Sequence, residues 1–170
     1  MVRSKAYLFS GVEIRWKSAV ADGDTPLEAT FRFPGGLADY LAETLGGATT
    51  YADKPFAGKV EFQGKFGVPG SVEWAVNWTP ARDGFIQSYC NTVPTPEGGT
   101  HEQGFWAAIL KGVKAYGELA GNRKAGQITR EDLLTGGSAL VSCFIREPEF
   151  VGQTKDRLAS SEAARLVEGA

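Results

Sequence analysis

Hydrophobic and polar residues alternate through the first part of the chain, a pattern typical of β-strands with one apolar face. The apolar positions of the first run are Val12, Ile14 and Trp16, and a second run of the same kind extends from 27 to 33. Between the two runs, the Asp-Gly-Asp sequence at 22–24 favours a turn. The pattern therefore predicts a β-hairpin with apolar side chains on one face.

Helical spacing follows the hairpin. Leu37, Tyr40, Leu41 and Leu45 fall on one face of a helix, and Gly46 is well suited to end it. Alternation then returns in three runs, which cover 57–66, 72–78 and 85–93, with a turn at 68–70 before the second run. Alternation of this kind predicts an antiparallel meander that is packed on one face and solvated on the other.

The last 70 residues predict a helix, a strand and a helix. Thr100 with Gln103 forms a capping box that begins the first helix, and Ser160 caps the last one, which extends to Leu166. The apolar stripe of the first helix consists of Phe105, Trp106, Ile109, Leu110 and Val113, and 130–134 adds a short helical turn. Residues 138–145 are almost continuously apolar, as in a central strand buried on both faces. The simplest fold for this order is a two-layer α+β sandwich.

Composition narrows the class of protein. The formal net charge is −2, from 18 Lys and Arg against 20 Asp and Glu, so the chain as a whole has no electrostatic signature of nucleic-acid binding. No apolar stretch reaches the roughly 18 residues that span a bilayer, and no signal peptide is recognisable, so we expect a cytosolic protein. Cys90 and Cys143 lie in apolar runs without metal-ligand spacing, and we expect buried free thiols.

Motifs of a self-contained active site are missing. The sequence has no GxxxxGK[ST] phosphate loop, no HExxH, no GxSxG and no metal-spaced cluster of His, Cys and carboxylates. The single histidine, His101, falls in the first turn of a helix, where the dipole disfavours a protonated imidazole, so we expect a neutral, hydrogen-bonded side chain. Trp74, Trp78 and Trp106 fall on apolar faces, and we expect core packing rather than sugar or base stacking.

One loop presents a concentrated set of polar groups. Gln153, Thr154 and Lys155 lie between the buried strand and the last helix, and they offer an amide, a hydroxyl and an ammonium in consecutive positions. Such groups can contact a ligand, whereas a lysine in a surface loop is more commonly just solvated. The residues alone leave both interpretations open.

Two segments together carry a resemblance to a known family. The run YCNTVPTPEGGTHEQGF at 89–105, followed by PEFVGQTKDRL at 148–158, closely resembles the ATPase-bearing subunit of bacterial type IIA DNA topoisomerases. The Asn-x-x-Pro-Thr form at 91–95 and the opening KAYLF at 5–9 are more similar to the topoisomerase IV branch than to the gyrase branch. The resemblance covers essentially the whole chain.

The resemblance implies a division into two domains. Residues 1–33 are similar to the closing hairpin of a GHKL-type ATPase domain, and residues 34–170 to the transducer domain, whose fold is like that of ribosomal protein S5 domain 2, with a left-handed βαβ crossover. In the family, the QTK loop reaches into the ATP site. Gln153 and Lys155 are then expected to contact the γ-phosphate of ATP, with Lys155 as catalytic support and as a sensor of that phosphate.

The resemblance further implies an incomplete active site. The Mg²⁺-holding asparagine, the water-activating carboxylate and the adenine pocket would belong to the rest of the GHKL domain, so this chain alone is expected to be inactive. The partners implied are that domain, a second copy of the same subunit, the DNA-cleaving A subunit and DNA, with ATP binding and hydrolysis coupled to gate closure and strand passage. Arg123 and Lys124 are candidate DNA contacts, although two adjacent charges also fit a solvated loop.

Two hypotheses therefore remain. In the first, the chain is a transducer within a topoisomerase IV-like subunit, and the apolar face of its hairpin, at 6–16 and 27–33, packs on its own domain or self-associates. The alternative hypothesis is a free-standing α+β module that holds a small ligand or a protein with its sheet or its tryptophans and has no catalytic activity.

Overall fold

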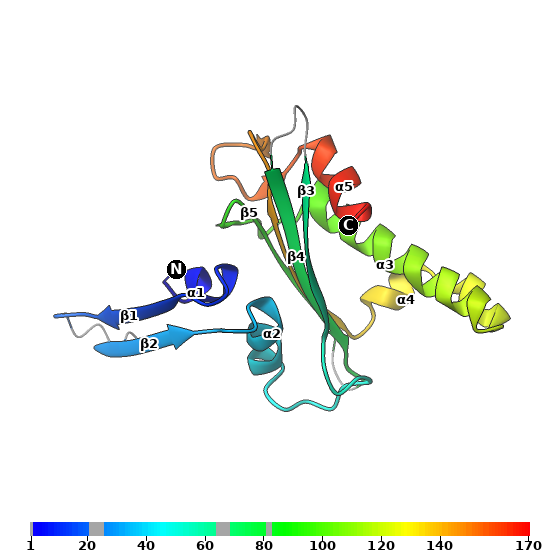
Figure 1. Cartoon of the computed structure of the whole chain (residues 1–170), viewed down its shortest axis with the longest axis horizontal. Helices are drawn as coiled ribbons and strands as arrows, with labels where there is room; N and C mark the ends of the chain where they lie inside the picture. Colours follow the sequence, from blue (N-terminus) through cyan, green and yellow to red (C-terminus); the bar gives the residue numbers. More distant parts are fainter. Residues whose placement is uncertain (1, 21–25, 64–68, 81–82) are drawn as a thin grey trace.

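The computed structural model describes residues 2–20, 26–63, 69–80 and 83–170. Its centre is a mixed five-stranded sheet with helices on both faces, and a two-stranded hairpin projects from one side (Figure 1). The strands are β1 (Glu13–Lys17), β2 (Glu28–Arg32), β3 (Phe56–Gln63), β4 (Pro69–Trp78), β5 (Phe85–Cys90), β6 (Val93–Pro94), β7 (Gly137–Phe144), β8 (Phe150–Val151) and β9 (Arg157–Leu158). The helices are α1 (Val2–Leu8), α2 (Leu37–Leu45), α3 (Thr100–Leu119), η2 (Arg123–Gln127), α4 (Arg130–Leu134) and α5 (Ser161–Glu168).

The predicted N-terminal hairpin is confirmed, with β1 antiparallel to β2 and Glu13 paired with Arg32. Its predicted turn at 22–24 lies outside the described residues. The apolar face was expected to begin at residue 6, but residues 2–8 form helix α1 instead. Within α1, Tyr7 stacks on Tyr40 of α2 with ring centroids 3.8 Å apart, so this helix connects the hairpin to the rest of the fold.

The order of strands in the central sheet is β3-β4-β7-β5-β6, so the predicted antiparallel meander is confirmed for β3 and β4 and is wrong for β5. Strand β7 lies between β4 and β5, antiparallel to β4 and parallel to β5. Strand β7 takes this position because nearly all of it is inaccessible to solvent. A strand that is apolar on both faces is stable only in the middle of a sheet that is covered on both faces. The parallel pairing of β5 with β7 requires a crossover connection, which contains α3.

Two hydrophobic cores lie on opposite faces of this sheet, so the two-layer prediction is confirmed for the elements from residue 57 onward and is wrong for the whole chain, where α1 and α2 add a third layer. One core packs α3 and α5 against alternate residues of β4, β5 and β7, and it includes the fully buried Trp106 and Val141. On the other face, α1 and α2 cover Ala75 and Leu140. The expected packing of the hairpin on its own domain is confirmed in part, because Ile14 and Phe31 contact this second core.

The ends of the helices follow the sequence predictions unevenly. Helix α2 ends as predicted at Gly46, whose φ of 59° is left-handed. The capping box at Thr100 is wrong, because Thr100 lies inside the helix after the N-cap Gly99 and its hydroxyl makes no capping hydrogen bond. Ser160 is the N-cap of α5, but its Oγ accepts from the backbone of Glu149 instead of capping the helix.

Two strand boundaries also differ from the prediction. The predicted third run, 85–93, is divided at Asn91 and Thr92, which both have positive φ, as in a two-residue turn between antiparallel strands. Lys5 of α1 donates to the backbone oxygen of Thr92 at 3.3 Å and to its hydroxyl, which holds this strained turn against the N-terminal helix. Pro69 and Gly70 begin β4 and do not form a turn, whereas residue 68 lies outside the described residues.

Candidate functional site

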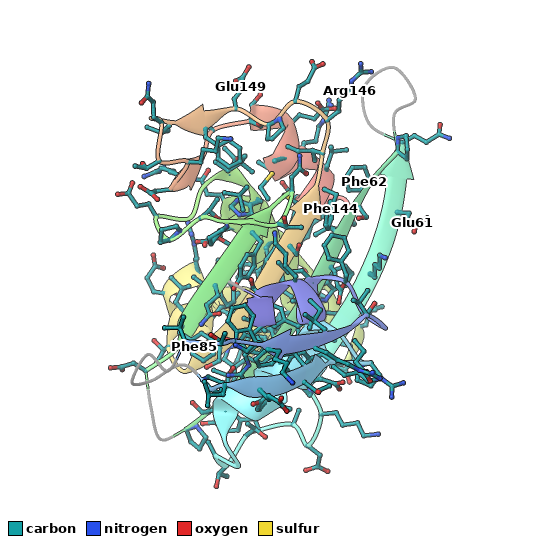
Figure 2. All side chains as sticks on the ribbon, turned by 90° about the vertical axis from the view of Figure 1, so that its left-hand side faces the viewer. Glu61, Phe62, Phe85, Phe144, Arg146 and Glu149 are labelled. Atoms are coloured by element: carbon teal, nitrogen blue, oxygen red, sulfur yellow. The ribbon has the colours of Figure 1, made fainter. Side chains whose placement is uncertain are left out.

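The loop that contains Lys155 joins two short antiparallel strands, β8 and β9, which the sequence did not predict. In Figure 1 it is the orange segment at one end of the sheet, on the side from which the N-terminal hairpin projects. Figure 2 shows Glu149, just before β8, at this end, whereas Phe85, which begins β5, lies at the other end. The loop therefore lies at the surface, at one end of the central sheet.

Gln153, Thr154 and Lys155 are all exposed. Lys155 has a φ of 61°, a left-handed conformation that a residue with a Cβ rarely adopts. Its Nζ lies 5.9 Å from the ring centroid of Phe150, a cation–π arrangement. Gln153 and Lys155, the two residues expected to contact the γ-phosphate, are thus both at the surface, in a loop with a left-handed residue at position 155.

The two sequence motifs meet in the structure. The backbone nitrogen of Glu97 donates to the oxygen of Asp156 at 2.9 Å, and that of Leu158 donates to the oxygen of Gly98 at 3.0 Å. Gly99 also forms an isolated parallel bridge with Leu158. Segment 97–99 therefore holds in place the residues directly after Lys155. The sequence does not indicate this contact, because the two segments are far apart along the chain.

A chain of hydrogen bonds fixes this segment from inside. The hydroxyls of Ser88 and Thr95 are 2.6 Å apart, and Thr95 Oγ1 lies 3.0 Å from Nε2 of His101. Ser88 Oγ also donates to the backbone oxygen of Thr95 at 3.2 Å. A proton on Nε2 lets imidazole and both hydroxyls each donate once along this chain, so we assign the Nε2–H tautomer to His101.

The prediction of a neutral His101 is confirmed, but for a different reason. Its side chain is completely buried, and burial lowers its pKa to about 4. Its Nδ1 has no hydrogen-bond partner in the part of the chain that the structure describes. Protonation would place an unpaired charge inside the protein, so imidazole stays neutral near pH 7.

Glu102 lies beside this network. Burial raises the pKa of its carboxyl, while the charges of Arg130 and Arg157 lower it. Arg157 belongs to β9, directly after the Lys155 loop, so its attraction to Glu102 adds an electrostatic connection between the loop and α3.

The candidate DNA contacts are elsewhere. Arg123 and Lys124 are exposed in η2, beyond the C-terminal end of α3, whereas the Lys155 loop adjoins the N-terminal end of that helix. A helix of 20 residues is about 30 Å long, so the two sites are well separated. The structure therefore does not bring all the predicted site residues together.

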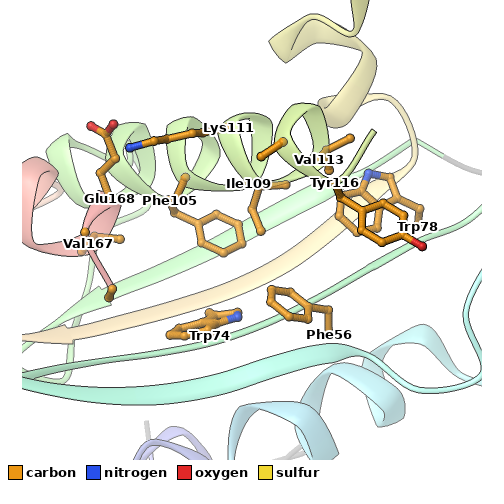
Figure 3. Close-up of a pocket in the computed structure, with 15 residues that line it drawn as sticks. Phe56, Trp74, Trp78, Phe105, Ile109, Lys111, Val113, Tyr116, Val167 and Glu168 are labelled. Carbon is orange, nitrogen blue, oxygen red and sulfur yellow. The ribbon is translucent and has the colours of Figure 1, made fainter. Parts of the chain in front are cut away.

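An apolar groove of about 770 Å³ lies between α3, α5 and the sheet. Trp74 and Phe56 line it from the sheet, opposite Phe105 and Ile109 of α3 (Figure 3). The prediction of core packing is confirmed for Trp106, which is buried. Trp74 and Trp78 also pack against this core, but they are only half-buried and line the groove. No sequence pattern indicated the groove, because an apolar strand face looks the same whether or not a helix covers it fully.

Cys90 and Cys143 are confirmed as buried free thiols on neighbouring strands. A hydrogen bond with Cys90, together with burial, raises the pKa of Cys143. Among the described residues, no three His, Cys, Asp or Glu side chains form a cluster that could hold a metal ion. No helix in the described ranges has the length and apolarity needed to cross a membrane.

Residues 36–170 match the sequence model of the family described as DNA gyrase B. The chain belongs to the DNA gyrase B family. Its relatives include the B subunit of DNA topoisomerase 4 from Caulobacter vibrioides, which is 57% identical over 99% of the chain. The chain covers 25% of that relative, so it spans about a quarter of the length of the relatives it matches.

Solved structures of the gyrase B family share this fold. The 43K ATPase domain of Thermus thermophilus gyrase B, in complex with an aminocoumarin, is 28% identical with a TM-score of 0.76, over 98% of this chain and 45% of that one. The topoisomerase IV ATP-binding domain of Francisella tularensis, in complex with a small-molecule inhibitor, is 26% identical with a TM-score of 0.73, over 98% and 42%. The mixed sheet with its helices thus matches the ATPase region of this family.

Proposed function

We propose that this chain is the transducer region of the ATPase-bearing subunit of a type IIA DNA topoisomerase of the topoisomerase IV type. In this role it couples ATP binding and hydrolysis to closure of the DNA gate and to strand passage. The observation that carries the proposal is the exposed Lys155 loop, held by backbone hydrogen bonds to segment 97–99. The 57% identity to the B subunit of a DNA topoisomerase 4 supports the choice of branch.

Within that subunit, Lys155 and Gln153 bind the γ-phosphate of ATP. An exposed ammonium and an exposed amide fit this ligand, because both donate hydrogen bonds to phosphate oxygens and the ammonium offsets their charge. Mg²⁺, when bound, neutralises further phosphate charge, and its ligands belong to the upstream domain. Lys155 loses its partner when the γ-phosphate leaves, so the loop also senses the state of the nucleotide.

The fold supports a path from this loop to the rest of the region. The loop is connected through β9 to the start of α3, and α3 packs along the central sheet, in which β7 is the middle strand. We assign residues 1–33 to the end of the GHKL ATPase domain and residues 34–170 to a transducer domain like ribosomal protein S5 domain 2, with its left-handed crossover. The parallel β5-α3-β7 arrangement is consistent with that fold.

The partners of the proposed subunit are a second copy of itself, the DNA-cleaving A subunit and DNA. Arg123 and Lys124, both exposed, are proposed DNA contacts. If they bind phosphates, replacing both with alanine in the full-length subunit weakens DNA binding and reduces the slope of log affinity against log salt concentration by about 2. An unchanged slope would exclude the contact.

The test of the proposed function is ATP hydrolysis by a full-length subunit that carries this region. Lys155→Ala is expected to lower kcat strongly and to change the affinity for ATP less, because the interaction matters most as charge develops in the transition state. Lys54→Ala is the matched control, since Lys54 is also an exposed loop lysine. Equal kcat values for Lys155→Ala and Lys54→Ala would refute the proposed function.

The apolar groove favours a second candidate function, a free-standing module that binds a small apolar ligand. Trp74 and Trp78 supply the aromatic surface that such a ligand requires. In that case, a fluorescent apolar probe binds the isolated chain saturably and Trp74→Ala abolishes this binding. Loss of hydrolysis with Lys155→Ala favours the transducer.

A further inference from the structure

Segment 95–102 contacts the Lys155 loop without supplying any group proposed to bind nucleotide. Two backbone hydrogen bonds join it to Asp156 and Leu158, the first and third residues after Lys155. A lysine with a left-handed backbone persists only where its surroundings determine that conformation. The hydrogen bonds to segment 95–102 help to fix the backbone conformation of Lys155, because they hold the residues on the C-terminal side of the loop.

Gly99 allows this contact because it has no side chain. Its φ is 143°, and a Cβ built at this position would lie 2.3 Å from the backbone oxygen of Leu158 and 2.7 Å from its nitrogen. Backbone atoms cannot move aside as a flexible side chain can, so any other residue forces β9 away from the start of α3. Gly98, with a φ of 69°, similarly leaves room for the carboxylate of Glu102, which folds back over it.

The other side of the segment is fixed in the core. Thr95 is 1% exposed, and its backbone nitrogen donates to the backbone oxygen of Ser88 in β5 at 2.9 Å. Its hydroxyl lies between the hydroxyl of Ser88 and the imidazole of His101. A buried network in which each proton has an acceptor holds one geometry. The segment is thus a rigid connection between the central sheet and the loop.

We propose that residues 95–102 form a positioning element that sets the place of Lys155 in the ATP site. This inference rests on the proposed function of Lys155. Gly99 and Thr95 are positioning residues: they act through the lysine and do not touch the nucleotide. A displacement of about 1 Å at a reacting centre costs on the order of 100-fold in rate. A side chain at position 99 would displace Leu158 and with it Lys155, so we expect it to lower the turnover of ATP.

The test is a double-mutant cycle on ATP hydrolysis by the full-length subunit. Gly99→Ala is expected to lower kcat on the order of 100-fold with little change in the KM for ATP. Gly112→Ala, within the helix that Gly99 precedes and with nothing within 4 Å of the added methyl group, is the matched control and is expected to keep kcat. In a Lys155→Ala background, Gly99→Ala should cause no further loss, because the group it positions is gone.

A loss of kcat from Gly99→Ala that is equally large with and without Lys155 would overturn the inference, as would a kcat equal to that of Gly112→Ala. Thr95→Val and Thr95→Ser decide the matter if Gly99→Ala does not fold. The valine removes the hydroxyl and should lower kcat only when Lys155 is present, while the serine restores it. If Lys155→Ala alone leaves kcat unchanged, the proposed function itself has failed.

Discussion

The burial of His101 makes the stability of the chain depend on pH in a predictable direction. In the folded state its pKa is about 4, whereas an unfolded chain has the ordinary value near 6.5. Between these two values the unfolded state binds a proton that the folded state does not. The stabilisation is therefore fully present above pH 6.5 and is lost as the pH falls towards 4.

The magnitude follows from the two pKa values. A tenfold difference in proton affinity is worth about 1.4 kcal/mol, so the full contribution is about 3 kcal/mol, and about 2 kcal/mol of it is lost between pH 7.5 and pH 5.0. Two carboxyls act in the opposite direction, because burial raises the pKa of Glu73 and of Glu102 and their charged forms are disfavoured in the folded state. The total pH profile of the chain therefore mixes these effects.

The comparison of the chain with His101→Gln isolates the histidine. Urea denaturation, followed by tryptophan fluorescence at several pH values, gives the free energy of unfolding of each protein. The carboxyl contributions are common to both and cancel in the difference. The unchanged chain should lose about 2 kcal/mol more than the variant between pH 7.5 and pH 5.0. Parallel profiles would refute the assignment of a buried, neutral imidazole with an unpartnered Nδ1.

Further predictions concern packing around α3, and urea denaturation checks each of them. Trp106→Ala removes the largest completely buried side chain of the core and should cost about 3–5 kcal/mol of unfolding free energy. Gly104→Ala should destabilise the chain, because the added methyl group would lie 2.2 Å from the backbone oxygen of Ala164 in α5, whereas Gly112→Ala, which meets nothing within 4 Å, should stabilise it by about 0.5–1 kcal/mol. Equal effects of the two glycine substitutions would contradict the close packing of α3 on α5.

Local patterns in the sequence predicted most elements but not the order of strands. The apolar run at 138–145 correctly indicated a strand buried on both faces, which became β7. That β7 pairs with both β4 and β5 could not be deduced, because alternation describes which way side chains face and says nothing about neighbours. The same limit explains the missed layer: α2 was predicted as a helix, but its spacing does not say which face of the sheet it covers.

The candidate site divides in the same way. Gln153 and Lys155 stood out because of the motif around them, and their exposure agrees with a binding role. The contact of Leu158 with Gly98 and Gly99 was beyond sequence reasoning, since it joins segments about 60 residues apart through backbone atoms. Thr100 illustrates the opposite error: its local pattern is that of a cap, but the cap lies one residue earlier, at a glycine that permits close approach to β9.

The most direct test of the central claim is to compare two nucleotides that differ by the γ-phosphate. Binding of a non-hydrolysable ATP analogue and of ADP should be measured by calorimetry in the full-length subunit, with and without Lys155→Ala. If Lys155 contacts the γ-phosphate, the variant binds the analogue more weakly and binds ADP as well as the unchanged protein does. Unchanged affinity for both nucleotides, or an equal loss for both, would contradict the account.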